Sequence, residues 1–249
     1  MRDLEAEGRV VTFTAEDLGY PKARRIYKAI TAEFDRAFDG VWSLAGSYTW
    51  SKTKGNYEGG VKSDNGQDDF GITTDFDQPG LIPGSYGYLP GDRRHNFKLY
   101  GSYQVTPWFL FGANFQAVSP RRFGCIGYVD ASIDPYVFRY GAAGNYCPLL
   151  EDGTLDPDVD PADFVVVPRG SAFKSDWQTA TNISLAFQVP TDALDAQLRF
   201  DVFNVFNEKA EIDFNELGTD DQGGVNGDYR KPLTYQTPRY VRVQLGLRF

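Results

Sequence analysis

The chain has 249 residues, a formal net charge of −9 at pH 7, 26 glycines and an aromatic content of 15%. An acidic chain without clustered Lys and Arg is poorly suited to hold a phosphate backbone, so the charge argues against nucleic acid as a partner. The sequence also lacks both the apolar run of about 20 residues that a membrane-spanning helix needs and the apolar stretch of a signal peptide. We therefore expect a cytosolic chain or one whose true N-terminus is missing.

Apolar and polar residues alternate with a period of two through seven long segments. In residues 41–51, for example, large residues such as Trp42, Tyr48 and Trp50 form one row, and small or polar residues such as Ser43 and Thr49 form the other. The segments, in chain order, are 25–38, 41–51, 94–105, 108–119 (where both rows carry apolar residues), 176–189, 196–206 and 240–249, with 9–14 as a weak eighth candidate.

The lengths of these segments favour a membrane over a soluble sheet. They run for about 11–14 residues, whereas soluble strands average about 5–6 and a tilted membrane-crossing strand needs about 9–11. Charged residues occupy the second row in mid-strand, where they would meet either a wet barrel lumen or, in a soluble β-sandwich, the outside water.

Short and long connections alternate strictly along the chain. The short links are 39–40, 106–107 and 190–195, and the long links are approximately 53–92, 120–172 and 207–238. A compact soluble domain rarely contains three such long links, whereas bacterial outer-membrane barrels combine short periplasmic turns with long extracellular loops. The sequence therefore predicts an all-β fold, namely an antiparallel transmembrane β-barrel segment of about eight strands.

The two cysteines, Cys125 and Cys147, lie in the same long link. In an oxidising compartment they would close a ring of about 23 residues, worth about 3 kcal/mol in the chain-entropy model. The alternative is a pair of free thiols.

We find no residue pattern typical of catalysis. His95 is the sole histidine, and it is in phase with Phe97 and Leu99, so we expect it to point outward in a structural role. Without a second base the chain offers no catalytic constellation. We therefore predict that the protein is not an enzyme, and we expect neither catalytic residues nor a cofactor.

The acidic run 152–163 resembles a calcium loop only in part. Asp156, Asp158 and Asp160 have the spacing of the first EF-hand ligands, but Pro161 replaces the required Gly and Val167 replaces the bidentate Glu. We expect no metal site, and interpret the run as a solvated acidic loop. A cation in some other geometry remains the alternative.

Two further surface features have less specific interpretations. The glycine-rich runs 55–60 and 220–227 are expected to be flexible surface loops, because neither has a phosphate-binding pattern. Arg121 and Arg122, just past a strand end, are expected either to form a solvated rim or to contact a substrate or lipopolysaccharide phosphates.

Several runs resemble strands of TonB-dependent receptors, especially the Oar-like group with large barrels. They are residues 91–103, 48–55 and 198–207, the last of which is similar to a penultimate strand ending in an Asn-hydrophobic-Phe-Asn element. The terminal strand resembles the signal read by the outer-membrane assembly machinery, in which alternating hydrophobic residues precede a final aromatic. Its residues are Val241, Val243, Leu245, Leu247 and Phe249.

The resemblance covers about residues 24–249 and implies a Gram-negative outer-membrane location. The family combines a 22-stranded barrel, an N-terminal plug and a TonB box that couples nutrient uptake to the proton-motive force. This sequence shows neither plug nor TonB box, so we expect residues 1–249 to be the C-terminal portion of such a barrel, with the signal peptide and plug absent.

The resemblance also implies the partners. They are outer-membrane lipid and lipopolysaccharide, the assembly machinery, TonB through the missing N-terminal part, and an unknown small-molecule or peptide ligand. Two alternatives remain open: a small stand-alone outer-membrane barrel or surface-adhesion protein without transport activity, and a soluble β-sandwich or enzyme.

Overall fold

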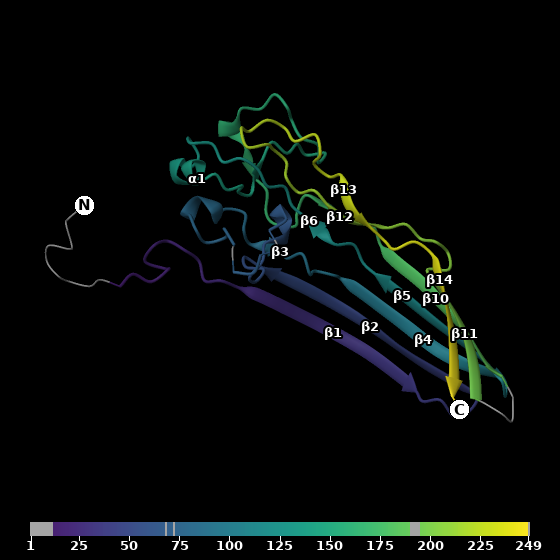
Figure 1. The fold of residues 1–249 in the computed structure, drawn as a ribbon. Helices are drawn as coiled ribbons and strands as arrows, with labels where there is room; N and C mark the ends of the chain where they lie inside the picture. The colour runs from purple at the N-terminus through teal and green to yellow at the C-terminus, as the bar shows by residue number, and fades with distance from the viewer. Residues whose placement is uncertain (1–11, 68, 72, 190–194, 249) are drawn as a thin grey trace.

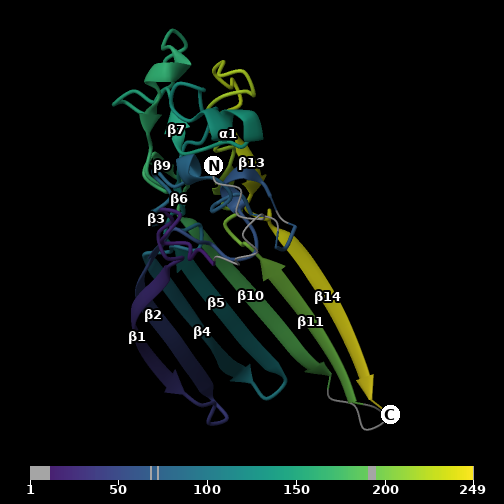
Figure 2. The same cartoon turned by 90° about the vertical axis from the view of Figure 1, so that its left-hand side faces the viewer.

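The computed structural model describes residues 12–67, 69–71, 73–189 and 195–248. The described chain is all-β and antiparallel, as predicted, with very little helix. Seven long strands lie side by side in one curved sheet, in the order in which they occur in the sequence (Figures 1 and 2). They are β1 (Arg25–Arg36), β2 (Trp42–Gly55), β4 (His95–Thr106), β5 (Phe109–Val118), β10 (Gln178–Val189), β11 (Asp195–Phe203) and β14 (Tyr240–Arg248).

The sheet reaches eight strands only through the two-residue β3 (Gly87–Tyr88), which pairs with the end of β2. The first three residues of the weak candidate 9–14 lie outside the described residues, and its last three are not in a strand. Within the described ranges, β1 and β14 each pair on one side only, so the sheet is open at both edges.

The connections alternate between the two ends of the sheet, as the sequence indicates. Residues 37–41 and 107–108 make the short turns at one end, and the link 190–194 lies outside the described residues. The three long links gather at the other end of the sheet (Figure 2). We call residues 56–94, 119–177 and 204–239 together the loop cap.

Strand register places the apolar rows of all seven long strands on one face. Directly opposed residues point to the same side of a sheet. The pairs Ile30↔Trp50, Trp42↔Tyr103, Leu99↔Phe115, Phe111↔Leu185, Phe187↔Leu198 and Leu198↔Leu245 carry this apolar face across the sheet. The opposite, polar face runs through pairs such as Ser47↔Lys98, Asn114↔Asn182, Ser184↔Asp201 and Asp201↔Arg242.

The apolar face is not covered by other parts of the described chain. Ile30, Val243 and Leu245 are 72%, 58% and 66% exposed. Aromatic and aliphatic surface of this extent marks a face that meets a partner or an apolar medium. No helix in the described residues has the length and hydropathy to cross a membrane.

The loop cap has a core of its own. One buried cluster comprises Leu81, Val129, Val137, Tyr146 and Phe164, which come from the first and second links. A second cluster comprises Cys125, Cys147 and Val167, and Tyr229 from the third link packs against it. The three links therefore fold as one body.

Short elements shape the cap. They are the strand pairs β6 (Arg122–Phe123) with β9 (Phe173–Lys174), β7 (Tyr146–Cys147) with β8 (Val165–Val166) and β12 (Glu211–Phe214) with β13 (Pro232–Tyr235), the helix α1 (Pro135–Tyr140), and the 3-10 turns Ser63–Asn65, Pro79–Leu81 and Pro161–Asp163. Asp134 caps α1, because its Oδ1 accepts from the N–H groups of Tyr136 and Val137 at 2.8 and 3.0 Å.

Candidate functional site

The polar face carries a charged group on β11 and β14, the last two strands of the sheet. Asp201 on β11 accepts from Arg199 Nε at 2.8 Å and from Arg242 Nη2 on β14 at 2.9 Å. The Asp201 side chain is 4% exposed, whereas those of Arg199 and Arg242 are 45% and 50% exposed. One carboxylate thus holds two guanidinium groups that stay open to solvent.

A shallow hollow of about 270 Å³ lies beside this group. Its floor includes Asn114, Asn182 and Ser184, and Asn182 Nδ2 donates to Asn114 Oδ1 at 3.3 Å. Amide, hydroxyl and guanidinium groups on one wet surface can bind polar and anionic solutes through hydrogen bonds.

The Asn-hydrophobic-Phe-Asn element at 204–207 has a clear structural role. Asn204 and Asn207 both adopt the left-handed backbone, with φ of 50° and 56°. Asn204 Nδ2 donates to the carbonyls of Glu208 and Thr237, and Asn207 Oδ1 accepts from the N–H of Arg239. The two asparagines therefore fasten the start of the third link to its end, just before β14.

A buried ion network joins the first and second links of the loop cap. Arg169 Nη2 lies 3.2 Å from Asp64 Oδ2 and 2.9 Å from Asp75 Oδ1, and Lys62 Nζ lies 3.3 Å from the same Asp75 oxygen. All four side chains are at most 4% exposed. Buried charges are tolerated only when paired, so each link depends on the other.

A second buried network joins the second and third links. Arg121, expected at a solvated rim, is instead 8% exposed and pairs with Asp213 and with Glu216, at 3.2 Å in the latter case. Glu216 Oε2 also accepts from the N–H of Gly124 at 2.5 Å. Burial, and next the negative charge of Asp64, raise the pKa of the Glu216 carboxyl to about 8.

The two cysteines meet at the centre of the loop cap. Cys125 and Cys147 form a disulfide, with their Cα atoms 6.0 Å apart, and neither residue is exposed. Gly218 from the third link packs against both sulfur atoms, and a Cβ at this position would clash with them. The disulfide thus lies where the second and third links touch.

His95 lies on the apolar face with Phe97, the phase that the sequence predicts. Its ring lies between those of Tyr48 and Trp177, with centroids 6.1 and 6.0 Å away, and the Tyr48 hydroxyl is 2.7 Å from His95 Nδ1. The group is an aromatic stack at the loop-cap end of the strands.

The acidic run and the glycine-rich run 220–227 both form turns held by their own side chains. Asp156 Oδ1 accepts from the N–H of Asp158, and Asp160 Oδ1 accepts from that of Ala162, both at 2.9 Å. Across the described residues no three His, Cys, Asp or Glu side chains converge as metal ligands. In the glycine-rich run, Asp220 Oδ1 accepts from Gln222 and Gly224.

The proposed assembly residues of the last strand form an exposed row. Val241, Val243, Leu245 and Leu247 lie on the apolar face of β14, and all are more than half exposed. Phe249 lies outside the described residues.

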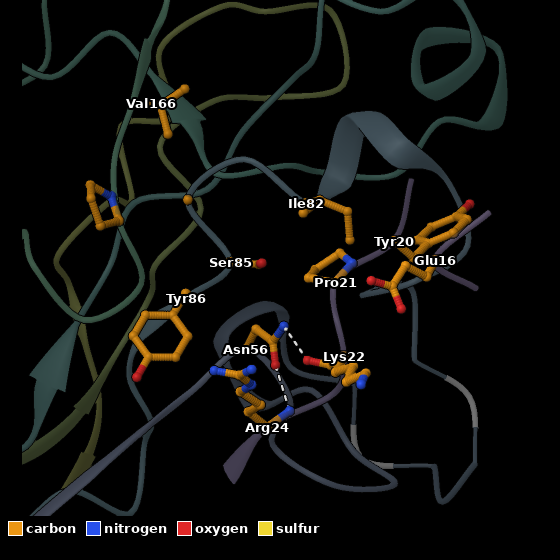
Figure 3. A pocket seen from close by; sticks show the side chains of 12 residues that line it. Glu16, Tyr20, Pro21, Lys22, Arg24, Asn56, Ile82, Ser85, Tyr86 and Val166 are labelled. Carbon is orange, nitrogen blue, oxygen red and sulfur yellow. Dashed lines mark hydrogen bonds between the residues drawn. The ribbon is translucent and has the colours of Figure 1, made fainter. Parts of the chain in front are cut away.

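A groove of about 740 Å³ opens between the segment before β1 and the loop cap (Figure 3). Asn56 closes its floor: the side chain accepts from the N–H of Arg24 at 2.7 Å and donates to the carbonyl of Lys22 at 3.1 Å. The lining combines charged groups such as Glu16 with the aromatic Tyr86. Such a mixed surface suits an amphipathic or polar solute.

Comparison with known proteins gives one informative relative. No family model matches the chain. The chain is 26% identical over 267 aligned residues to the TonB-dependent transporter Oar of Myxococcus xanthus, and the match covers 92% of the chain. The chain spans about 23% of the length of that curated relative. The resemblance inferred from short strand motifs is thus confirmed over nearly the whole chain.

The raised pKa of Glu216 predicts a pH-dependent loop cap. A carboxyl whose pKa is raised on folding stabilises the protein below its ordinary value of 4.5, and this contribution is lost as the pH rises towards about 8. We compare the thermal unfolding midpoint of the full gene product with that of its Glu216→Gln variant at each pH. We expect the midpoint of the unchanged protein minus that of the variant to fall by on the order of 5 °C between pH 5 and pH 9. The control is Glu151→Gln, which changes an exposed carboxyl. If the midpoint difference between the unchanged protein and Glu216→Gln were the same at pH 5 and pH 9, the raised pKa of Glu216 would be contradicted.

Proposed function

We propose that residues 1–249 are the C-terminal portion of the β-barrel of a TonB-dependent transporter in the outer membrane of a Gram-negative bacterium. Three observations support this proposal: the similarity to a transporter of that class, the small share of its length that the chain spans, and the open edges at β1 and β14. Unpaired strand edges of this length invite pairing with further strands, which the rest of a large barrel would supply. They favour the transporter over a stand-alone small barrel.

The continuous apolar face is the observation that carries the proposal. A membrane strand must satisfy its backbone within the sheet and present apolar side chains to lipid on one side only. The long strands have 9–14 residues, and an apolar row runs across all seven of them. In this proposal the apolar face meets lipid, and the polar face with Asp201 lines the lumen.

This placement assigns each end of the sheet to one side of the outer membrane. The short turns lie in the periplasm, and the loop cap faces the cell exterior, where an oxidising environment suits its disulfide. The loop cap, with the groove beside Asn56, takes part in capturing a scarce nutrient, a small molecule or peptide. The polar face forms part of its route inward, and TonB acts through a part of the protein outside this chain. No step of this activity calls for a cofactor or for enzymatic chemistry.

Adjacent residues on opposite faces of β10 test the membrane placement. We expect Leu185→Arg, on the apolar face, to cost about 2–4 kcal/mol at the bilayer midplane and to lower the amount of full gene product in the outer membrane. Ser184→Arg on the polar face places the same charge opposite Asp201 and should insert normally. Immunoblots of fractionated membranes measure both. Equal amounts of the two variants would argue against the lipid-facing assignment.

Transport itself is tested in the host with the gene deleted. Four labelled solutes are tested: a ferric siderophore, an oligosaccharide, a peptide and cobalamin. We expect the uptake of one of them to fall to the rate of passive diffusion when the gene is deleted, and to return when the gene is restored. An ionophore that collapses the proton-motive force should abolish the same uptake. If no class depends on the gene, the transport proposal fails.

The terminal strand is proposed as the assembly signal read during insertion. We expect Phe249→Ser to lower the amount of assembled protein, because the assembly signal that the terminal residues resemble ends in an aromatic side chain. Heat-modifiable migration on gels measures assembly, and Arg139→Ser in the loop cap is the control. Full assembly of the Phe249 variant would exclude this role.

A further inference from the structure

Four cationic side chains surround one aromatic ring where the sheet meets the loop cap. Lys54 Nζ and Arg122 Cζ lie 4.3 and 4.2 Å from the centroid of the Tyr88 ring, and Lys52 Nζ and Arg94 Cζ both lie 5.7 Å from it. We call Lys52, Lys54, Arg94 and Arg122 the basic cluster.

The basic cluster is on the same side of the sheet as the apolar face. Tyr88 pairs directly with Lys54, and Lys52 and Lys54 continue the row of Tyr48 and Trp50 along β2. Arg94 Cζ also lies over the Trp50 ring, 5.6 Å from its centroid. The cluster therefore follows immediately after the aromatic residues at the loop-cap end of the apolar face.

The positive charge of the cluster is poorly neutralised. Asp92 Oδ2 lies 3.8 Å from Arg122 Nε and 4.0 Å from Arg94 Nη2, while its Oδ1 accepts from the N–H of Thr53 at 2.6 Å. Among the ion pairs of the described residues, none includes Lys52 or Lys54. Lys28 on β1 lies directly opposite Lys52 and adds a further positive charge.

Stacking on Tyr88 does not by itself explain four cations. An aromatic ring has two faces, and a cation gains most when it lies close over one of them. Lys54 and Arg122 are close enough to use the ring in this way, whereas Lys52 and Arg94 stand farther off. Burial acts to raise the pKa of the Tyr88 phenol, but Arg94, Lys54, Arg122 and Lys52 outweigh it and lower the pKa.

We infer that the basic cluster binds the phosphate group of a membrane lipid whose acyl chains lie along the apolar face. Arginine offers a planar fork of donors to phosphate oxygens, and lysine offers a compact charge. The Arg94 and Arg122 side chains are 26% and 28% exposed, so a headgroup can reach them. The inference rests on the proposed membrane placement, because only there would acyl chains cover the neighbouring apolar residues.

Binding is measured with the full gene product in micelles of an uncharged detergent. Isothermal titration uses dioctanoyl phosphatidic acid, the phosphate-free dioctanoylglycerol and inorganic phosphate as probes. We expect Lys54→Gln/Arg122→Gln to bind phosphatidic acid about 25-fold more weakly, taking about fivefold for each cation near an anionic lipid. The matched control is Lys98→Gln/Arg139→Gln, which removes two exposed cations, one on the polar face of β4 and one in α1, and should bind like the wild type.

Three outcomes would overturn the inference: equal affinity in the variant and the wild type, equal affinity for dioctanoylglycerol, or inorganic phosphate binding as tightly as phosphatidic acid. The last result would mean a site for free phosphate and not for a lipid. Lys52→Gln/Arg94→Gln provides a second variant if the first does not fold. Because binding is measured in micelles, it is independent of whether the transport proposal holds, which the uptake measurements decide.

Discussion

Strand register is the constraint on which the rest of the molecule depends. A shift of one residue between two strands would move every side chain of one strand to the other face. Pairs such as Phe111↔Leu185 and Leu198↔Leu245 instead keep large apolar residues together, while Ser184↔Asp201 keeps polar residues together. The same register places Tyr88 beside Lys54 and so assembles the basic cluster.

The arrangement of the loop cap is set mainly by pairing between buried charged side chains. Its two apolar clusters are small, and buried charges connect the links that they join. Arg169 holds two aspartates of the first link, and Arg121 holds Glu216 of the third. Buried pairs add little net stability, but removing one partner leaves an unpaired charge inside, which costs about 3–5 kcal/mol. The networks therefore contribute little to the stability of the loop cap, and their main effect is to select one arrangement of the three links.

The strands could be predicted from the sequence because their periodicity is local. Residues 25–38 correspond to β1, and 41–51 correspond to β2, although β2 continues to Gly55. The period-two pattern stops at residue 51 because Lys52 and Lys54 interrupt the apolar row, at the place where the basic cluster forms. The run 48–55, which resembles a receptor strand, does reach the end of β2. The turns around Asp156 and Asp160 were likewise predictable as loops, since short carboxylates bond to the nearby backbone.

The loop cap could not be predicted in the same way, because its contacts join residues far apart in the chain. Arg169 and Asp75 are separated by 94 positions, and nothing in the sequence near either residue indicates the other. Acidic residues in a link suggest a solvated surface, yet Asp64 and Asp75 are buried. Arg121 and Arg122 are adjacent in sequence but differ in exposure. Arg121 is buried inside the loop cap, whereas Arg122 is partly exposed beside Tyr88.

The shared interior of the loop cap restricts how this surface can diverge. Exchanging one link for that of a relative would leave Arg169 or Arg121 facing side chains selected for another neighbour, and Gly218 admits no larger residue against the sulfur atoms. Substitutions at exposed tips, such as the turn at Asp220, meet no such barrier. New specificity on this scaffold would therefore arise by point changes at the rim, or by replacement of all three links together.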